Sequence, residues 1–306
     1  MAGRRTAGWA AIACVLLLAA GCAQRAVGAT GPTDSPAPPP PGGLVLQVRL
    51  VGGFLPVGLL HGSVPAVSVY ADGRVISEGP SDSVRPGRAL PNLQVQRISA
   101  ADVRALVDRA LAAGVGDTAD LGRPGVSDAG TTRFTLVTDS GTHVRDVYAL
   151  AEGVGGTVRT GGGYGPPPSV RPVQGVTAEQ QAARAKLLGL LRALTDLGST
   201  LPAGTVGAPT AYVPQAVAAV VTPAHFGPDD PPQQPRPWPG PALPGTPLAE
   251  PGVSCVTATG SQATAVLAAA RSANQLTPWT TPDGRQWWVT FRPLLPNETG
   301  CADLAH

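Results

Sequence analysis

The sequence predicts an α+β protein: an antiparallel sheet of hairpins packed by two or three helices, then a small disulfide-closed C-terminal lobe of strand, helix and hairpin. Asp72-Gly73 and Asp139-Ser140-Gly141 each separate two apolar runs, which is typical of β-hairpins. The stretches 99–114 and 177–198 combine capping residues with apolar residues three or four positions apart, which indicates helices. Because hairpins and helices alternate along the chain, the order favours an antiparallel sheet over a doubly wound parallel one.

The expected strands lie in four apolar runs. The run 44–55 is rich in valine and leucine and predicts the first strand. The run 66–78 predicts a hairpin with a two-residue loop, Asp72-Gly73, whose residues need positive φ angles. The run 133–150 predicts a second hairpin, and 212–221 predicts a further strand.

Both predicted helices begin at a capping box. Ser99 is expected to cap the first helix with Asp102 as its partner, and Gly114 is placed to end it. Thr177 and Gln180 form the equivalent pair for the second helix, which we expect to end at Gly198. The apolar face of each helix must pack on the sheet.

The C-terminal third is divided by a proline-rich segment. Eleven prolines fall within 223–251, so this segment cannot be a helix or a central strand. From Val253 onward we expect a short strand at Cys255, a helix over 261–270 and a hairpin turned at 282–284. The predicted organisation is therefore an α+β domain over 44–222, a linker over 223–252 and a lobe over 253–306. A lobe this small is expected to dock on the first domain.

The N-terminal segment has the arrangement of a bacterial export signal. Arg4 and Arg5 precede an apolar run, 9–20, that is short for a membrane span. The residues Leu18-Ala19-Ala20-Gly21-Cys22 resemble the lipobox of bacterial lipoproteins, with Ala19 where that pattern usually has leucine. The resemblance implies cleavage before Cys22, acylation of its thiol and anchoring at the outer, extracytoplasmic face of the cytoplasmic membrane. A secreted product of an ordinary signal peptide and an uncleaved anchor remain as alternatives.

Residues 1–21 are thus predicted to be a lipoprotein signal peptide, and 22–43 a proline-rich tether that lifts the folded part off the bilayer. Cys14 is lost with the signal, and Cys22 receives the lipid. Cys255 and Cys301 then remain in an oxidising compartment, where such a pair usually bonds, so we predict a disulfide between them. Closing a loop of this length contributes roughly 4 kcal/mol in loop-closure models.

Charge and motif content exclude several classes of function. Of the 22 basic residues, Arg4 and Arg5 lie in the signal, which leaves 20 against 20 acidic residues. This balance lacks the basic excess of a nucleic-acid-binding protein, so no nucleic acid is expected as a partner. The glycines after Glu152 do not complete a dinucleotide-binding motif, because Val158 stands where the third glycine belongs. No cofactor is expected.

The residues also show no catalytic or metal-binding motif. None of the four histidines has the spacing of a metal site or a triad; the four are His61, His143, His225 and His306. His61 is expected to be a loop residue. The acidic loop from Asp117 through Asp120 to Asp128 has carboxylates for a calcium ion but not the spacing of a calcium-binding loop, which favours turn formation.

Trp238, framed by Pro237 and Pro239, is the one possible binding residue that we single out. It either packs on a core, the favoured interpretation, or presents an exposed aromatic side chain to a partner. We expect a non-catalytic binding or scaffold protein of the cell envelope, whose partner is an envelope protein or a cell-wall component. The alternative is a cell-envelope hydrolase with a site assembled from scattered polar residues.

Two resemblances accompany these predictions. Residues 51–150 resemble a family of secreted domains of unknown function, through Val69-Tyr70-Ala71-Asp72-Gly73-Arg74-Val75, the segment 98–103 and Val147-Tyr148. That family's Cys-Pro near the first turn is replaced here by Leu55-Pro56, so a role of its cysteine does not carry over. The whole chain resembles uncharacterised actinobacterial lipoproteins that end in Arg-Pro-Leu-Leu-Pro, here 292–296, before a last cysteine, here Cys301. Turn and cap motifs specify a fold and not a chemistry, so neither resemblance implies an activity.

Overall fold

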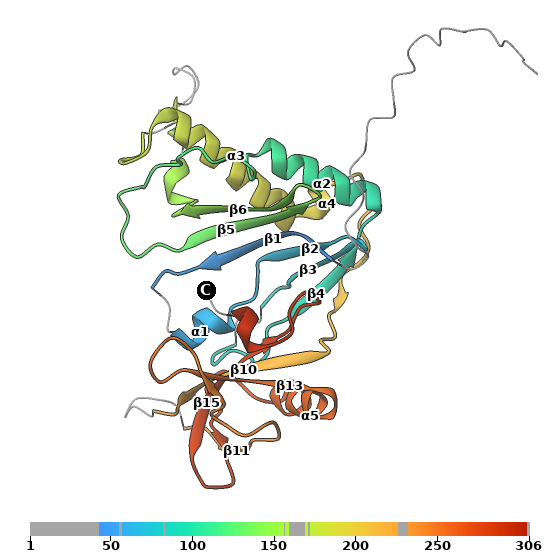
Figure 1. The fold of residues 1–306 in the computed structure, drawn as a ribbon, viewed down its shortest axis with the longest axis vertical. Helices are drawn as coiled ribbons and strands as arrows, with labels where there is room; N and C mark the ends of the chain where they lie inside the picture. The colour runs from blue at the N-terminus through green and yellow to red at the C-terminus, as the bar shows by residue number, and fades with distance from the viewer. Residues whose placement is uncertain are drawn as a thin grey trace, which may run out of the picture. The chain divides into compact units, whose positions relative to one another are not determined.

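The computed structural model describes residues 43–54, 57–81, 84–155, 157–158, 169–170, 172–225 and 232–304, which belong to one compact unit (Figure 1). The predicted signal peptide 1–21, the lipidation residue Cys22, the tether up to residue 42, Leu55-Pro56 and His306 lie outside the described residues. The fold is α+β with two antiparallel-rich sheets, as the sequence predicts. No helix in the described ranges has the length and apolar character needed to cross a membrane.

The first sheet has seven strands in the order β6-β5-β1-β2-β3-β4-β9, and all neighbours run antiparallel. The two hairpins predicted for this part of the chain are confirmed, because β2 pairs with β3 and β5 pairs with β6. The strands are β1 Leu44–Val51, β2 Val67–Tyr70, β3 Arg74–Glu78, β4 Leu93–Arg97, β5 Thr131–Thr138, β6 Gly141–Tyr148 and β9 Thr210–Ala211.

The loop of the first hairpin is longer than the predicted two-residue loop. It comprises residues 71–73, and the Gly73 amide donates a hydrogen bond to the Tyr70 carbonyl at 3.0 Å. Within this loop only Gly73 has a positive φ, +80°, which is the pattern of a three-residue hairpin loop with a left-handed last residue. A Cβ at Gly73 would also clash with the carbonyl oxygen of Ile98, so both the turn and this close approach require glycine.

The two predicted helices of this part are α2, Ala100–Ala112, and α3, Ala178–Thr195, and both predicted capping boxes form. The second helix ends earlier than predicted. Asp196 leaves the helical region with φ −131° and ψ 73°, and its carboxylate accepts from the Ser199 amide to begin a separate short helix, α4, Leu197–Thr200. Figure 1 shows α2 and α3 on one face of the first sheet, where Leu106 and Leu187 pack in the same core as Phe134.

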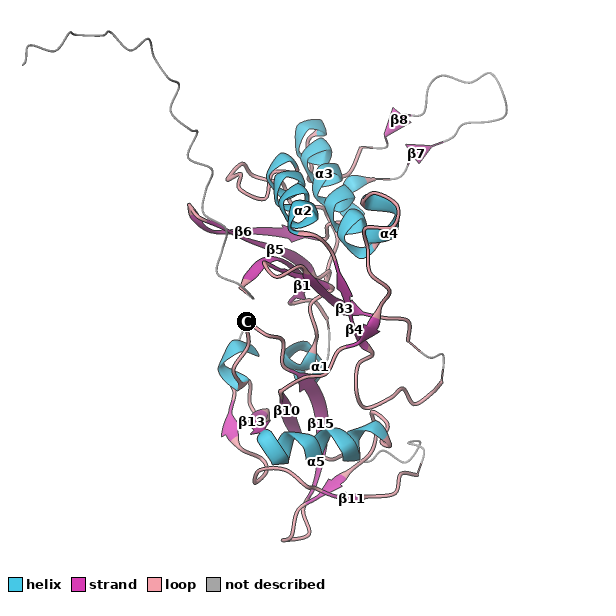
Figure 2. Cartoon of the chain, turned by 90° about the vertical axis from the view of Figure 1, so that its right-hand side faces the viewer, coloured by secondary structure: helices cyan, strands magenta, loops and turns pink. Residues whose placement is uncertain are grey.

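The second sheet has six strands in the order β11-β14-β15-β10-β13-β12. All pairs are antiparallel except β11 with β14. Helix α5, Gly260–Arg271, lies along this sheet (Figure 2) and buries Val266 and Ala270 against Val217 and Phe291. The strands are β10 Ala216–Pro223, β11 Arg236–Pro237, β12 Thr246–Pro247, β13 Ser254–Thr259, β14 Trp279–Thr280 and β15 Gln286–Pro293.

Strand β10 changes the predicted division of the chain. The strand expected at 212–221 was assigned to a domain ending at 222, but β10 lies between β13 and β15 in the second sheet. The C-terminal lobe therefore needs a central strand from before the proline-rich segment. The described residues of that segment are mostly irregular, as its composition predicts, and include the two-residue strands β11 and β12.

Several short elements complete the fold. Helix α1, Val57–Gly62, and strand β4 lie outside the predicted elements. The remaining elements are the 3-10 helices η1, Glu152–Val154, and η2, Cys301–Leu304, and a two-stranded sheet of β7, Thr157–Val158, and β8, Ser169–Val170.

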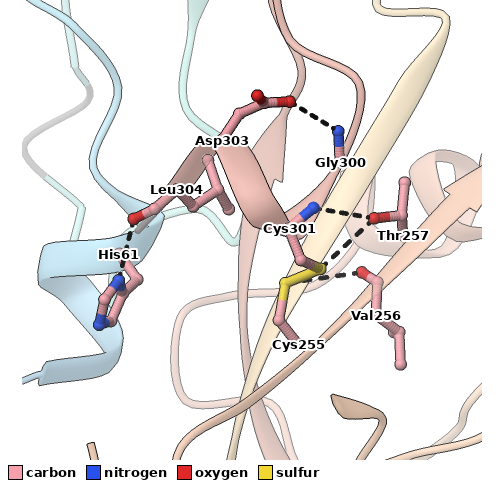
Figure 3. The surroundings of a disulfide bond; sticks show 8 residues. All are labelled: His61, Cys255, Val256, Thr257, Gly300, Cys301, Asp303 and Leu304. Atoms are coloured by element: carbon pink, nitrogen blue, oxygen red, sulfur yellow. Dashed lines mark hydrogen bonds between the residues drawn. A yellow bond between two sulfur atoms is a disulfide. The ribbon is translucent and has the colours of Figure 1, made fainter. Parts of the chain in front are cut away.

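The predicted disulfide is confirmed. Cys255 on β13 bonds to Cys301 at the start of η2, with a sulfur–sulfur distance of 2.07 Å (Figure 3). The Cys301 amide also donates to the Thr257 hydroxyl at 3.1 Å, so both a covalent bond and a hydrogen bond hold η2 to β13.

The chain passes between the two sheets at several places. Helix α1 contacts β10 and β15, although its neighbours in sequence, β1 and β2, belong to the first sheet. The long connection between β3 and β4 also reaches the second sheet, where the Ala89 amide donates to the Ala273 carbonyl at 3.2 Å. The connection between β9 and β10 is the third crossing. Residues from all three segments line one cavity, among them Leu59, Leu90 and Tyr212.

Candidate functional site

His61 is the most buried histidine of the described chain, with 3% of its surface exposed. It lies in α1 and not in a loop as expected, because residues 57–62 form a helical turn between the sheets. Its Nδ1 atom lies 3.0 Å from the Leu304 carbonyl oxygen, and its Nε2 atom lies 2.7 Å from a Glu250 carboxylate oxygen. Figure 3 shows the ring directed at Leu304, close to the disulfide.

The two partners of His61 determine what its ring can do. Both are hydrogen-bond acceptors, and each of the two ring nitrogens faces one of them. A general base needs a nitrogen that a substrate proton can reach. With both nitrogens engaged and the side chain buried, His61 is arranged to connect α1 to two distant segments.

A buried ion pair lies nearby, between Arg292 at the end of β15 and Glu298. The Arg292 Nη2 atom is 2.6 Å from Glu298 Oε1, and the two side chains are 0% and 6% exposed. Arg292 also donates to the Ser63 carbonyl at 3.0 Å and to the Pro293 carbonyl at 2.6 Å. Burial lowers the pKa of the Arg292 guanidinium, and the negative charge of Glu298 partly offsets this. The pair connects the second sheet to the loop after α1.

Two tyrosines also donate hydrogen bonds to the segment 294–297, which follows β15. The Tyr70 hydroxyl, on β2, donates to the Asn297 side chain at 2.7 Å, and the Tyr212 hydroxyl donates to the Leu294 carbonyl at 2.8 Å. Burial raises the pKa of both phenols, so they stay protonated donors at neutral pH. We call the four contacts His61–Leu304, Ser63–Arg292, Tyr70–Asn297 and Tyr212–Leu294 the inter-sheet contacts.

Beside these contacts lies a cavity of about 1110 Å³, at or just above the roughly 300–1000 Å³ common for small-molecule sites. Its walls are the β3–β4 connection, the segment 211–214, the end of α5 and β15. The polar side chains that line it are Ser63, Glu78, Ser81, Arg85, Arg88, Asn92, Tyr212, Arg271, Gln275 and Thr290. The apolar ones include Leu59, Val84, Leu90, Leu93, Val213, Leu267, Val289 and Phe291.

Trp238 is partly buried against the core of the second sheet. Its ring lies edge-on to Trp279, with 5.7 Å between centroids, and stacks on Phe291 at 6.2 Å. Its indole Nε1 donates to the Pro241 carbonyl at 2.6 Å. The structure thus places Trp238 in a packing position, the favoured one of the two interpretations.

The other polar residues considered in the sequence lie apart from the cavity. The Asp120 carboxylate accepts from the Gly122 amide and from the Gln180 side chain, so it ties the acidic loop to the start of α3. Within the described residues, no three histidine, cysteine or acidic side chains are grouped to hold a metal ion. His143 lies 3.2 Å from the Thr138 hydroxyl at a hairpin turn, and His225 contacts Trp288.

Sequence reasoning missed the cavity residues because none belongs to a motif. Arg85 and Arg88 lie in the 79–92 connection, and Arg271 ends α5. One usable signal was the length of that connection, since loops longer than about 12 residues without secondary structure are often functional. No model of a protein family, no curated protein and no solved structure matches this chain.

Proposed function

We propose that this chain is an extracytoplasmic lipoprotein, anchored through Cys22 at the outer face of the cytoplasmic membrane, that binds a small-molecule ligand rather than catalysing a reaction. The observation that carries the proposal is the cavity, because its volume is close to that of a small-molecule site and its wall combines apolar side chains with polar and charged ones. The export signal, the lipobox-like residues and the resemblance to actinobacterial lipoproteins support the location.

The arrangement of His61 supports binding over hydrolysis. A hydrolase would need a base or a nucleophile open to substrate, and His61 with Glu250 is the most suggestive pair in the described chain. The Nδ1 and Nε2 atoms of His61 are both engaged by acceptors, and the ring is 3% exposed. The geometry therefore gives this pair a structural role, and the envelope hydrolase remains the less supported alternative.

Ligand binding in the cavity can be tested by a substitution that fills the cavity with a large side chain. Ala211 lines the cavity, whereas Thr210, its neighbour on β9, does not. We expect native mass spectrometry of the chain purified from its own membranes to show a bound small molecule, which Ala211→Trp removes and the control Thr210→Trp retains. Both variants should keep the wild-type melting temperature, because both positions are exposed on a two-residue strand. Identical occupancy in the two variants, or an empty wild-type protein, would contradict the proposal.

The anchor has a separate test. Cys22→Ala should leave the chain without a diacylglyceryl group and shift it from the detergent-rich phase to the aqueous phase. Mass spectrometry of the wild-type N-terminus measures the modification directly. An unmodified N-terminal residue on the mature wild-type chain would exclude lipidation while leaving the cavity proposal open.

A further inference from the structure

Three arginines gather at one end of the cavity. Arg271 is the last residue of α5, and Asn274, shortly after it, forms an antiparallel bridge with Arg88. The Gln275 amide also donates to the Gly87 carbonyl at 2.9 Å. These backbone contacts hold the part of the β3–β4 connection that carries Arg85 and Arg88 beside the end of α5 that carries Arg271.

Two of these arginines keep their donors available. Neither Arg85 nor Arg271 forms a hydrogen bond or ion pair with a residue that the structure describes. Elsewhere the chain pairs arginines with carboxylates, as in Arg133–Asp146 and Arg285–Asp283. Glu78 is the only acidic side chain among the described cavity residues, and no arginine pairs with it. Arg85 and Arg271 together therefore carry more positive charge than Glu78 can offset.

Apolar side chains line much of the rest of the cavity, and several of them are exposed. Leu59, Val84 and Val213 line it and are 46%, 64% and 67% exposed, which is unusual for large apolar side chains. Deeper in the cavity the wall is formed by Val289 and Phe291 of β15. An exposed apolar rim that continues into an apolar wall offers a surface for a hydrocarbon chain and not for a fully polar anion.

We infer that the ligand is an amphiphile with an anionic head, a carboxylate or a phosphate, and a single hydrocarbon chain. Arg85 and Arg271 hold the head through charge-assisted hydrogen bonds, and the chain lies along the wall formed by Val289 and Phe291. This inference rests on the proposed function, because it names the ligand class of the same cavity.

The test uses the chain from residue 23 onward, which contains the whole compact unit and lacks the lipidated cysteine. The fluorescent probe is dansylaminoundecanoic acid, an anionic amphiphile. We expect dodecyl phosphate and dodecanoate to displace it. Dodecyltrimethylammonium, with the same chain and a cationic head, should bind at least about tenfold more weakly, since one charge-assisted contact accounts for that factor. Inorganic phosphate alone should not displace the probe.

Substitutions of Arg271 and Arg85 test whether these two side chains bind the anionic head group. Arg271→Ala and Arg85→Ala should each weaken dodecyl phosphate binding about tenfold. Arg104→Ala is the matched control, because it removes the same charge from an exposed position on α2 away from the cavity and should leave binding unchanged. Equal melting temperatures for all variants would show that the loss is local.

The outcomes separate this inference from the proposed function. If a native ligand is lost in Ala211→Trp but head charge and the arginines make no difference, the cavity binds a ligand of another class and the inference fails alone. If an oligoglutamate peptide displaces the probe and dodecyl phosphate does not, the site takes an acidic segment of a protein and the inference is wrong. Transfer of lysophosphatidylglycerol, which has one acyl chain, from vesicles to the protein would identify a phospholipid as the source of the anionic head. Displacement by dodecanoate without such transfer would identify a free fatty acid.

Discussion

The Nε2 atom of His61 lies 2.7 Å from a carboxylate oxygen of Glu250, although 189 positions separate the two residues. On the other side of the same ring, Nδ1 lies 3.0 Å from the Leu304 carbonyl, 243 positions away. One side chain on a short helix thus connects the proline-rich segment and the C-terminal 3-10 helix to the part of the chain that forms the first sheet.

Replacing His61 should destabilise the fold. His61→Ala leaves the Leu304 carbonyl and the Glu250 carboxylate without this partner, and we expect the free energy of unfolding to fall by about 2–3 kcal/mol. Chemical denaturation measures this change, and His143→Ala, at a hairpin turn, should shift it by less than about 0.5 kcal/mol. A His61→Ala protein that unfolds like wild type but loses its cellular role would instead indicate a reactive histidine.

The buried pair Arg292–Glu298 gives a second stability prediction. Arg292→Met leaves the Glu298 carboxylate buried without its cation, which should cost about 3–5 kcal/mol. The double variant Arg292→Met/Glu298→Leu removes both charges and should be less destabilised than the sum of the single changes. A double-mutant cycle on thermal unfolding measures the difference, and strict additivity would show that the two side chains act independently.

Trp238 should contribute to stability through packing. Trp238→Ala removes the contacts with Trp279 and Phe291, and because the ring is only partly buried we expect a loss of about 2–3 kcal/mol, less than for a fully buried tryptophan. Trp238→Phe keeps an aromatic ring but loses the hydrogen bond to Pro241, so its loss should be about 1 kcal/mol. If Trp238→Ala melts like wild type and loses ligand or partner binding, the residue serves recognition instead.

Glu78 should make stability depend on pH. Partial burial raises the pKa of its carboxyl above the ordinary value of 4.5, so the folded state holds this proton more tightly than the unfolded state. Stability from this group is therefore fully present below the ordinary pKa and is lost as the pH rises through the raised value. Glu78→Gln should be more stable than wild type by about 0.5 kcal/mol or less at neutral pH, since the carboxyl is partly solvated.

This pH effect is measured by urea unfolding at two pH values. The advantage of Glu78→Gln should disappear at about pH 4, where the wild-type carboxyl becomes protonated in both states. Glu179→Gln, at the exposed start of α3, is a control whose effect should not follow this pattern. An advantage that is the same at both pH values would show that it does not come from ionisation of Glu78.

Local signals in the sequence predicted local structure well. Ser99 with Asp102 and Thr177 with Gln180 form their capping boxes because the interacting atoms are three residues apart in sequence. The Asp-Gly turn marks its hairpin for the same reason, although the loop has three residues and not the two that were predicted. The disulfide followed from elimination among four cysteines.

Nonlocal relationships were not predicted. Strand β10 has an apolar sequence that suits either sheet, and only its pairing with β13 and β15 decides its place. His61 gave no signal because its partners lie far away in sequence. The arginines of the cavity were missed for the same reason, since the bridge between Arg88 and Asn274 that brings them together joins two segments of unremarkable composition.

The inter-sheet contacts have a consequence for the order in which the chain folds. The first sheet is complete at β9, which ends at Ala211, and its hairpins and capped helices form from residues close in sequence. The four partners on the other side, Arg292, Leu294, Asn297 and Leu304, all come from the last part of the described chain. Until that part emerges, His61, Ser63, Tyr70 and Tyr212 lack these contacts, and the disulfide cannot form before Cys301 is present. Completion of the second sheet and of the cavity therefore requires β15, and we expect a chain stopped before β15 to form the first sheet without a complete cavity.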